Sequence, residues 1–203
     1  TLDPGIDFFN KKLSVDLSFG FQRDHLDNNK AYKTERSIIS GKLTARPWKF
    51  YLLHITVGNY SIAQQSGLYE PDPAIRVSQA TFNSSVMQQF MFVKASLSHN
   101  LNVLYSGQQL NDQNTNTNEF TEFKMTTASA MYSLGLTKIR LQISASWAFS
   151  DYSQNNIDTR VSGPFFILSK TFLNKYTGGI SYSKRITKID GDKSRQTTSI
   201  GFS

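Results

Sequence analysis

The clearest pattern in the chain is a two-residue alternation of apolar and polar positions over residues 137–150, TKIRLQISASWAFS. The apolar row consists of Ile139, Leu141, Ile143, Ala145, Trp147 and Phe149, and the opposite row of Arg140, Gln142, Ser144, Ser146 and Ala148. Successive side chains of a β-strand point to opposite faces, so the segment predicts a strand with one apolar and one polar face. Strands of soluble sheets have about five or six residues, whereas a tilted strand that crosses a bilayer needs roughly nine to eleven. The length of this segment therefore favours a transmembrane strand.

Similar segments recur along the chain. The expected strands are 13–23, 37–46, 50–61, 76–92, 98–106, 120–134, 137–150, 159–169, 175–189 and a last strand that holds Thr198, Ile200 and Phe202. Long polar connections are expected at 25–35, 62–74, 107–118 and 151–157, and they alternate with short ones. Outer-membrane barrels have short periplasmic turns and longer extracellular loops, so this rhythm predicts an orientation with both chain ends on the periplasmic side.

These segments predict an all-β fold, an antiparallel up-and-down transmembrane β-barrel of about ten strands that occupies residues 1–203 as a single domain. One alternative is that the strands are one arc of a larger barrel and that the chain is the C-terminal part of a longer protein. Another alternative is a soluble secreted β-sandwich that binds at a surface, which would have shorter strands and turns about every 8–12 residues. No helical pattern of useful length is present.

The alternation also assigns side chains to the two faces of the wall. The apolar residues expected to face lipid are Leu17, Phe19, Leu53, Ile55, Val57, Leu141 and Ile143. The polar residues expected to face the interior are Asp16, Lys42, His54 and Arg140. The aromatic residues expected at the membrane interfaces are Trp48, Tyr60, Phe92 and Tyr105.

Composition and charge narrow the choice of class. Hydrophobic residues make up 38% of the chain, and no window of about 18 apolar residues exists, which excludes membrane-spanning helices. The chain has no cysteine, which rules out disulfide staples, thiolate metal sites and a cysteine nucleophile. The net charge of +7 raises the question of nucleic-acid binding. Because the Lys and Arg residues gather near the expected connections and not on one face, we expect a solvated rim and no nucleic-acid partner.

A family resemblance rests on three segments, GIDFFNKKLSVDLSFGFQRDHLDNNKAYKTER, LNVLYSGQQLND and TTSIGFS. In the style of these strands and loops the chain resembles the outer-membrane barrel portions of uncharacterised proteins from the Bacteroidota. The resemblance spans most of the chain and implies a Gram-negative source, an outer-membrane location and further sequence upstream. Barrel proteins of such bacteria commonly end in an aromatic residue, whereas here Phe202 is penultimate and Ser203 is last.

These observations predict a bacterial outer-membrane protein that serves passage, anchoring or envelope-complex formation, without covalent chemistry. Its expected partners are membrane lipids and other outer-membrane proteins. Two further hypotheses are a subunit of an outer-membrane transport or secretion assembly and a barrel hydrolase that uses His54 with a hydroxyl or carboxylate from a neighbouring strand. No cofactor is expected, because no nucleotide-binding, zinc or calcium motif is present. His25 beside Asp24 and Asp27 is a candidate cation ligand in a loop.

Overall fold

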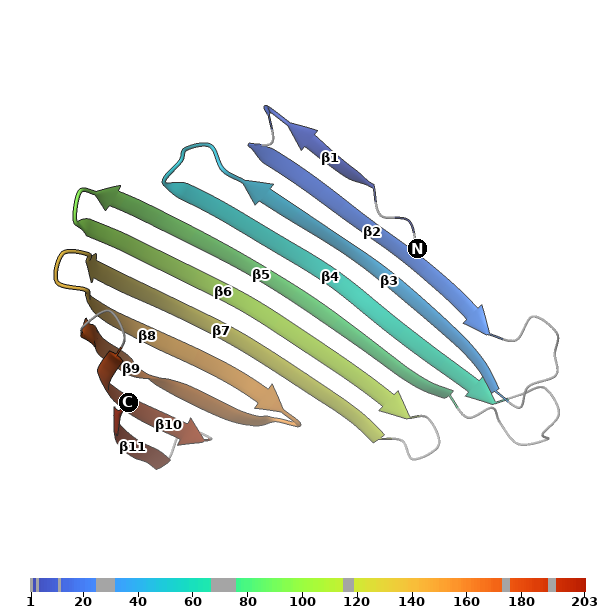
Figure 1. The fold of residues 1–203 in the computed structure, drawn as a ribbon. Helices are drawn as coiled ribbons and strands as arrows, with labels where there is room; N and C mark the ends of the chain where they lie inside the picture. Colours follow the sequence, from blue (N-terminus) through green and yellow to red (C-terminus); the bar gives the residue numbers. More distant parts are fainter. Residues whose placement is uncertain are drawn as a thin grey trace.

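The protein folds as one antiparallel sheet in which every strand pairs with the next strand of the chain. The computed structural model describes residues 2, 4–10, 12–24, 32–66, 76–114, 119–172, 176–189 and 193–203. The strands are β1 (Gly5–Phe8), β2 (Leu13–Asp24), β3 (Tyr32–Ala45), β4 (Tyr51–Ser66), β5 (Arg76–Lys94), β6 (Leu97–Asn114), β7 (Glu119–Leu136), β8 (Leu141–Gln154), β9 (Ile157–Phe172), β10 (Tyr176–Ile189) and β11 (Lys193–Phe202). Figure 1 shows the resulting meander from β1 to β11. The described residues contain no helix that is long and apolar enough to cross a membrane. The predicted all-β, up-and-down fold is confirmed, with 11 strands where about ten were expected.

Two of the expected long loops belong largely to strands. Residues 107–114 continue β6 and residues 151–154 continue β8, and both are paired in full register with β7. The tight connection between β8 and β9 is only Asn155 and Asn156, both with positive φ. The expectation of loops was wrong here because both rows of these segments are polar, so the chain keeps its strand conformation while the alternation that reveals a strand disappears. Of the expected loops at 25–35 and 62–74, residues 32–35 belong to β3 and residues 62–66 to β4, and the remaining parts of both loops, with the candidate ligands His25 and Asp27, lie outside the described residues.

Two further boundaries differ from the prediction. Residues 5–8 form the short strand β1, which pairs with the start of β2, where a turn and an aromatic pair were expected. Gly135 and Leu136 end β7, and the turn to β8 is Thr137–Arg140. Both errors concern strand ends, where the alternating pattern covers too few residues to be recognised.

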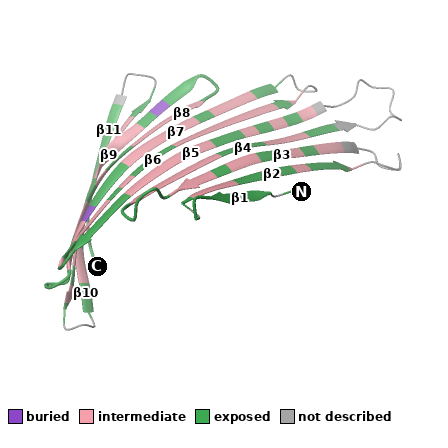
Figure 2. Cartoon of the chain, turned by 90° about the horizontal axis from the view of Figure 1, so that it is seen from above, coloured by how far each residue is buried: buried purple, intermediate pink, exposed green. Residues whose placement is uncertain are grey.

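The sheet is a single curved layer without a hydrophobic core (Figure 2). No apolar side chain among the described residues is buried, and the buried polar ones are Ser133 and Thr159. Large apolar groups remain open on one side, including Trp147 at 53% exposure and Phe202 at 80%. Since no second sheet covers these side chains within the described part of the chain, the soluble-sandwich alternative is wrong.

The pairing register divides the sheet into two faces. We call the face that carries Leu17, Val57 and Leu101 the apolar face, and the face that carries Asp16 and Thr56 the polar face. One row of direct partners on the apolar face runs through Leu53, Gln88, Val103, Ala130 and Trp147. The same register places all seven side chains expected to face lipid, from Leu17 to Ile143, on this one face.

The apolar face changes character along the strands. On β6 it begins with Leu97 and continues through Leu101 to Tyr105, after which Gln109, Asn111 and Gln113 follow. We call the end with the connections 46–50, 95–96 and 137–140 the turn end, and the opposite end the polar end. The 18 residues of β6 correspond to a height of roughly 40 Å at a rise of about 3.3 Å per residue and a tilt of about 45°. The outward apolar band of such barrels is only about 25 Å tall, so the strands continue well beyond this band towards the polar end.

One discontinuity interrupts the ladder between β9 and β10. The pairs on either side are Phe165 with Ser183 and Ser162 with Ile186, and no pair is formed between them. Pro164 has no backbone N–H to donate. At the neighbouring Gly163, a Cβ atom would collide with the backbone carbonyl oxygen of Lys184. The absence of a side chain at residue 163 therefore allows the two backbones to approach where the ladder is broken.

Replacing Gly163 by Ala should destabilise the assembled protein, because the clash is with backbone that cannot rotate away. We expect a loss of about 1–3 kcal/mol, as for overpacking of a tight site. The matched control is Gly41→Ala, whose new methyl group would meet Leu17 Cδ2 at an ordinary 3.5 Å. Urea unfolding of the whole protein in lipid vesicles measures both, and equal midpoints would contradict the close approach.

Candidate functional site on the polar face

The polar face carries a row of small hydroxyl side chains across the middle of the sheet. Direct cross-strand partners in this row are Thr56, Ser85, Ser106, Thr127 and Ser150, which we call the hydroxyl row. Thr56 Oγ1 lies 2.6 Å from Ser85 Oγ, and Thr127 Oγ1 lies 3.4 Å from Ser150 Oγ. A nearby pair on the same face, Ser133 and Ser144, is bonded at 2.9 Å. The row presents short groups that both donate and accept hydrogen bonds, which suits contact with water or a polar solute.

The hydroxyl row continues into a charged pair at the β2 side. Asp16 is the direct partner of Lys42, which is in turn the direct partner of Thr56. These three residues, with Ser40, Gly58 and Asn83, contribute to a hollow of about 610 Å³. The hollow is open at Gly58 because no side chain projects there; a Cβ at this position would meet only the Ser40 Cβ at 3.5 Å and a backbone oxygen at 3.9 Å. The hollow thus combines a carboxylate, an ammonium group and hydroxyls, which can orient a polar solute by charge and hydrogen bonds.

His54 lies on the polar face, where the sequence placed it, next to Thr44 and Met87. Its Nδ1 is 3.0 Å from Thr44 Oγ1, a hydrogen bond within the wall. The direct cross-strand partners of His54 are Thr44 and Met87, neither of which is a carboxylate. The described residues also contain no group of three or more His, Asp or Glu side chains that could hold a metal ion. The geometry around His54 is that of a wall residue bonded to its neighbour.

Arg140 was expected in the interior, and this prediction is wrong. It lies in the turn before β8 with a positive φ of 53°. Its N–H donates to the Thr137 carbonyl at 3.3 Å, and its carbonyl accepts from Thr171 N–H at 3.1 Å. The alternating pattern of 137–150 extended through the turn by coincidence, so the sequence placed the start of the strand too early.

The four interface aromatics have different positions. Trp48 lies in a connection at the turn end and stacks on Phe50, with ring centroids 5.8 Å apart. Phe92 is also at that end, and Tyr105 lies where the apolar stretch of β6 finishes. Tyr60 pairs with Ile38 and Thr81 on the polar face, so it cannot belong to an outward girdle. The sequence predicted Tyr60 in a girdle because the residue is aromatic, but its place in the two-residue alternation puts its side chain on the polar face.

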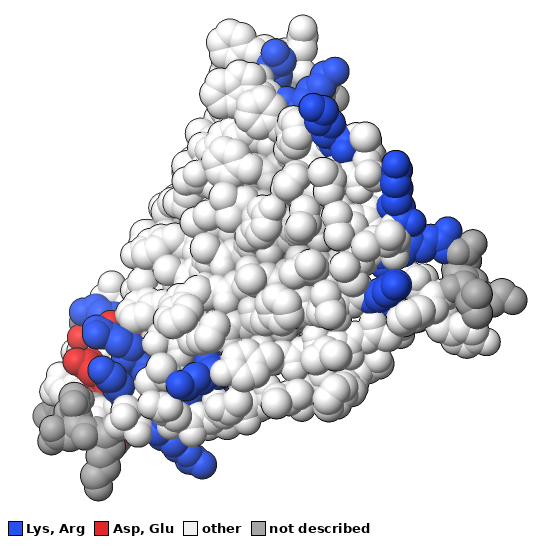
Figure 3. All heavy atoms as spheres, turned by 90° about the vertical axis from the view of Figure 1, so that its left-hand side faces the viewer, with Lys and Arg blue, Asp and Glu red and all other residues white. Residues whose placement is uncertain are grey.

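Charge is distributed unevenly between the two ends. The described residues of the connections at the turn end include the basic residues Lys12, Arg46, Lys49, Lys138 and Arg140 and no acidic residue. Figure 3 shows a broad surface without charged side chains, with Lys and Arg along one margin and a mixed group of both signs at the opposite lower corner. A mixed group on the apolar face is formed by residues such as Lys124, Asp151 and Arg160. The sequence reasoning missed it because Asp151 was expected in a loop, and because the register that brings Arg160 beside Asp151 was not known. Charges at every second position, Glu122 and Lys124, then Asp158 and Arg160, are the signal that would have found them.

Comparison with solved structures places this sheet among outer-membrane barrels. The ferric preacinetobactin receptor BauA of Acinetobacter baumannii aligns with 98% of this chain and 41% of its own length, at 10% identity and a TM-score of 0.65. The copper transporter OprC aligns with 98% of this chain and 38% of its own at 9% identity and a TM-score of 0.60. A loop-deleted form of OmpT, an outer membrane protein of Vibrio cholerae, aligns with 98% of this chain and 60% of its own at 11% identity and a TM-score of 0.53. No protein-family model matches the sequence, and no curated protein matches it.

These likenesses fix the class. The chain has the fold of an outer-membrane β-barrel protein, and the outer-membrane location expected from the sequence is confirmed. It spans about two fifths of the length of the receptor and the transporter that it matches. These solved structures do not test the resemblance to proteins from the Bacteroidota, which stays a prediction.

An arginine placed on the apolar face should be far more harmful than one placed beside it on the polar face. Leu101 is the centre of the apolar stretch of β6 and Asn102 is its neighbour on the other face. We expect Leu101→Arg to lower the free energy of folding into vesicles by about 2–4 kcal/mol. Asn102→Arg is the control and should have a much smaller effect.

Depth along the strand adds a second comparison. Leu141 opens β8 directly after the turn, beside Lys170 on the same face. Because the penalty falls to about 0–1 kcal/mol near the interfaces, Leu141→Arg should be tolerated much better than Leu101→Arg. Equal losses for all three variants in a urea titration would reject the assignment of faces.

Proposed function

We propose that this chain forms part of the wall of a transport barrel, through which a polar solute passes without covalent chemistry. The single observation that carries the proposal is the continuous hydroxyl row on the polar face, joined to the hollow at Asp16 and Lys42. With the apolar face against lipid, this row faces the interior of the barrel. The turn end then lies at the periplasm, and the polar end, where β6 continues beyond its apolar stretch, projects outward.

The barrel needs more strands than the described sheet provides. β1 and β11 are the two edges of the sheet, and β1 is only 4 residues long. In hydrocarbon, the unpaired N–H and C=O groups of an open edge would each carry a large penalty. We therefore propose that further strands, from more of the same polypeptide or from a partner in an envelope assembly, pair with these edges and close the wall.

The named activities of two neighbours suggest the solute class. BauA is described as a ferric preacinetobactin receptor and OprC as a copper transporter. We propose that the solute here is likewise a metal or a metal chelate, recognised by hydroxyl and charged groups of the wall and not altered chemically.

Cysteine labelling tests which face is wet. The chain has no cysteine, so each introduced thiol reports one position. In outer-membrane vesicles that contain the whole protein, Thr56→Cys and Ser85→Cys should react rapidly with a water-soluble maleimide. Their neighbours on the apolar face, Val57→Cys and Ser84→Cys, are the controls and should be protected by lipid. Labelling of both sets at the same rate would contradict a lipid-facing apolar side.

Filling the hollow tests transport itself. Gly58→Trp should lower uptake of a ferric chelate or copper several-fold, because the indole would occupy the space beside Asp16 and Lys42. Ile55→Trp is the control: Ile55 lies on the apolar face and does not line the hollow, so this variant should leave uptake unchanged. The measurement is uptake of labelled metal by cells that carry each variant at equal surface levels. If Gly58→Trp transports as well as the unaltered protein, this hollow is not on the solute's route.

A further inference from the structure

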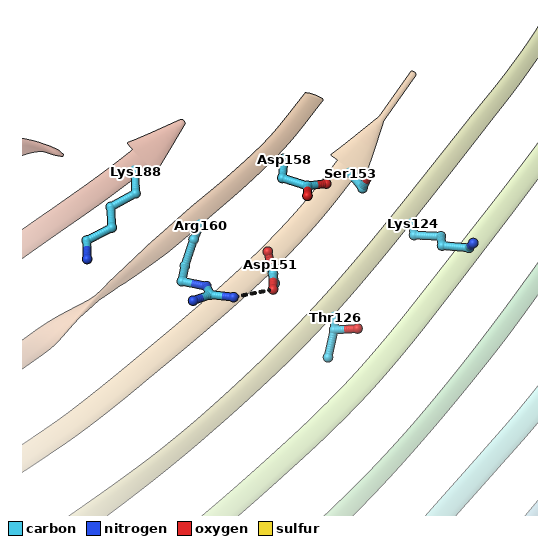
Figure 4. Close-up of a pocket in the computed structure, with 7 residues that line it drawn as sticks. All are labelled: Lys124, Thr126, Asp151, Ser153, Asp158, Arg160 and Lys188. Atoms are coloured by element: carbon cyan, nitrogen blue, oxygen red, sulfur yellow. Dashed lines mark hydrogen bonds and ion pairs between the residues drawn. The ribbon is translucent and has the colours of Figure 1, made fainter. Parts of the chain in front are cut away.

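A charged groove lies on the apolar face where the apolar stretch ends. It has a volume of about 390 Å³ and is lined by Lys124, Thr126, Asp151, Ser153, Asp158, Arg160 and Lys188. The lining residues come from β7, β8, β9 and β10 (Figure 4). The proposed transport route does not use this groove, because every one of these side chains is on the face opposite to the hydroxyl row.

The pairing register fixes the height of the groove. Thr126, Asp151, Arg160 and Lys188 are consecutive cross-strand partners and form one row. The next row towards the turn end contains Ala128, Phe149 and Ser162. Along β8 and β9 the groove therefore begins one residue pair beyond Phe149 and Ser162, and we place it at the level where lipid headgroups replace acyl chains.

Charged groups of the groove are held in place by their neighbours. Arg160 Nη2 lies 3.1 Å from Asp151 Oδ2, the contact drawn in Figure 4. The same guanidinium lies over the Phe149 ring, 5.5 Å from its centroid, so it is anchored at the apolar border. Lys124 Nζ contacts Glu122 Oε1 at 2.5 Å, whereas Lys188 makes no ion pair within the described part of the chain. The groove thus holds three cations and the hydroxyls of Thr126 and Ser153, and it also contains the carboxylates of Asp151, which pairs with Arg160, and Asp158.

We propose that the charged groove binds the phosphorylated headgroup of a glycolipid in the outer leaflet of the outer membrane. Lys and Arg supply charge and donors to phosphate oxygens, and the hydroxyls donate further hydrogen bonds. Phe149 and Trp147, on the same face towards the turn end, contact the acyl chains of the same lipid. The basic connections at the turn end cannot serve this lipid, because they lie at the opposite leaflet. The inference depends on the outward orientation of the polar end, which the proposed function also assumes.

The test compares bound glycolipid after extraction of the whole protein from outer membranes in a mild detergent. The variant carries Lys124→Gln, Arg160→Gln and Lys188→Gln, and we expect a loss of about fivefold in affinity for each cation removed. The control is Lys170→Gln, which removes a cation from the same face at the turn end, where Lys170 lies 5.4 Å from the Phe172 ring centroid. Glycolipid per protein should fall in the triple variant and stay unchanged in the control. Equal amounts in both would overturn the proposal.

Two additions keep the result decisive. If the triple variant does not assemble, as judged by heat-modifiable migration, Lys188→Gln alone replaces it, because Lys188 makes no ion pair with any residue that the structure describes. Thermal stability is then measured in phospholipid vesicles with and without the glycolipid, and with inorganic phosphate. Stabilisation by inorganic phosphate equal to that by glycolipid would show a free-anion site and overturn the lipid proposal. Uptake of metal should stay normal in the groove variants, so a failure here is distinguishable from a failure of the transport proposal.

Discussion

The need to pair every backbone N–H and C=O group where water is absent governs this structure. An antiparallel ladder meets that need along the length of each strand, and consecutive strands pair from β1 to β11 without a crossover. The gap in the ladder at Pro164 shows what a missing donor requires. Pro164 has no backbone N–H, and the adjacent Gly163, which has no side chain, allows the backbone of β10 to approach closely there. The same need applies at the two edges of the sheet, and it is why we infer additional strands.

Because the ladder pairs the backbone N–H and C=O groups, the side chains on the two faces of the sheet can differ in polarity. The apolar face has no core to pack into, and its aromatic and aliphatic groups stay exposed in the isolated chain. The polar face has short hydroxyls that bond to one another, as Thr56 does with Ser85. Among the described residues, the wall is therefore held together by its hydrogen bonds and not by the interdigitated interior of a soluble protein.

The change of chemistry along the strands has a functional meaning as well. β6 and β7 keep their pairing beyond the apolar stretch, and there the outward side chains become Gln109, Glu122 and Lys124. In the orientation that we propose, this part of the wall rises above the acyl chains, and the charged groove lies there. The turn end shows the opposite design, with basic connections and a stacked Trp48 and Phe50.

The sequence by itself determined most of the strands, the apolar and the polar face of each and the class of fold, because the alternation persists wherever the two sides of a strand have different surroundings. The placement of Leu17 and Asp16 on opposite faces followed from that pattern alone. Where both sides of a strand meet water, the alternation disappears, and the sequence therefore predicts loops at 107–114 and 151–154. Arg140 is wrongly predicted in a strand because the residues of its turn continue the alternation. Only the tertiary structure decided the register, and with it which rows meet: Asp16 beside Lys42 and Thr56, and Arg160 beside Asp151. Register depends on the connections and on how each strand pairs with the next one, and the alternation within a single strand does not record it.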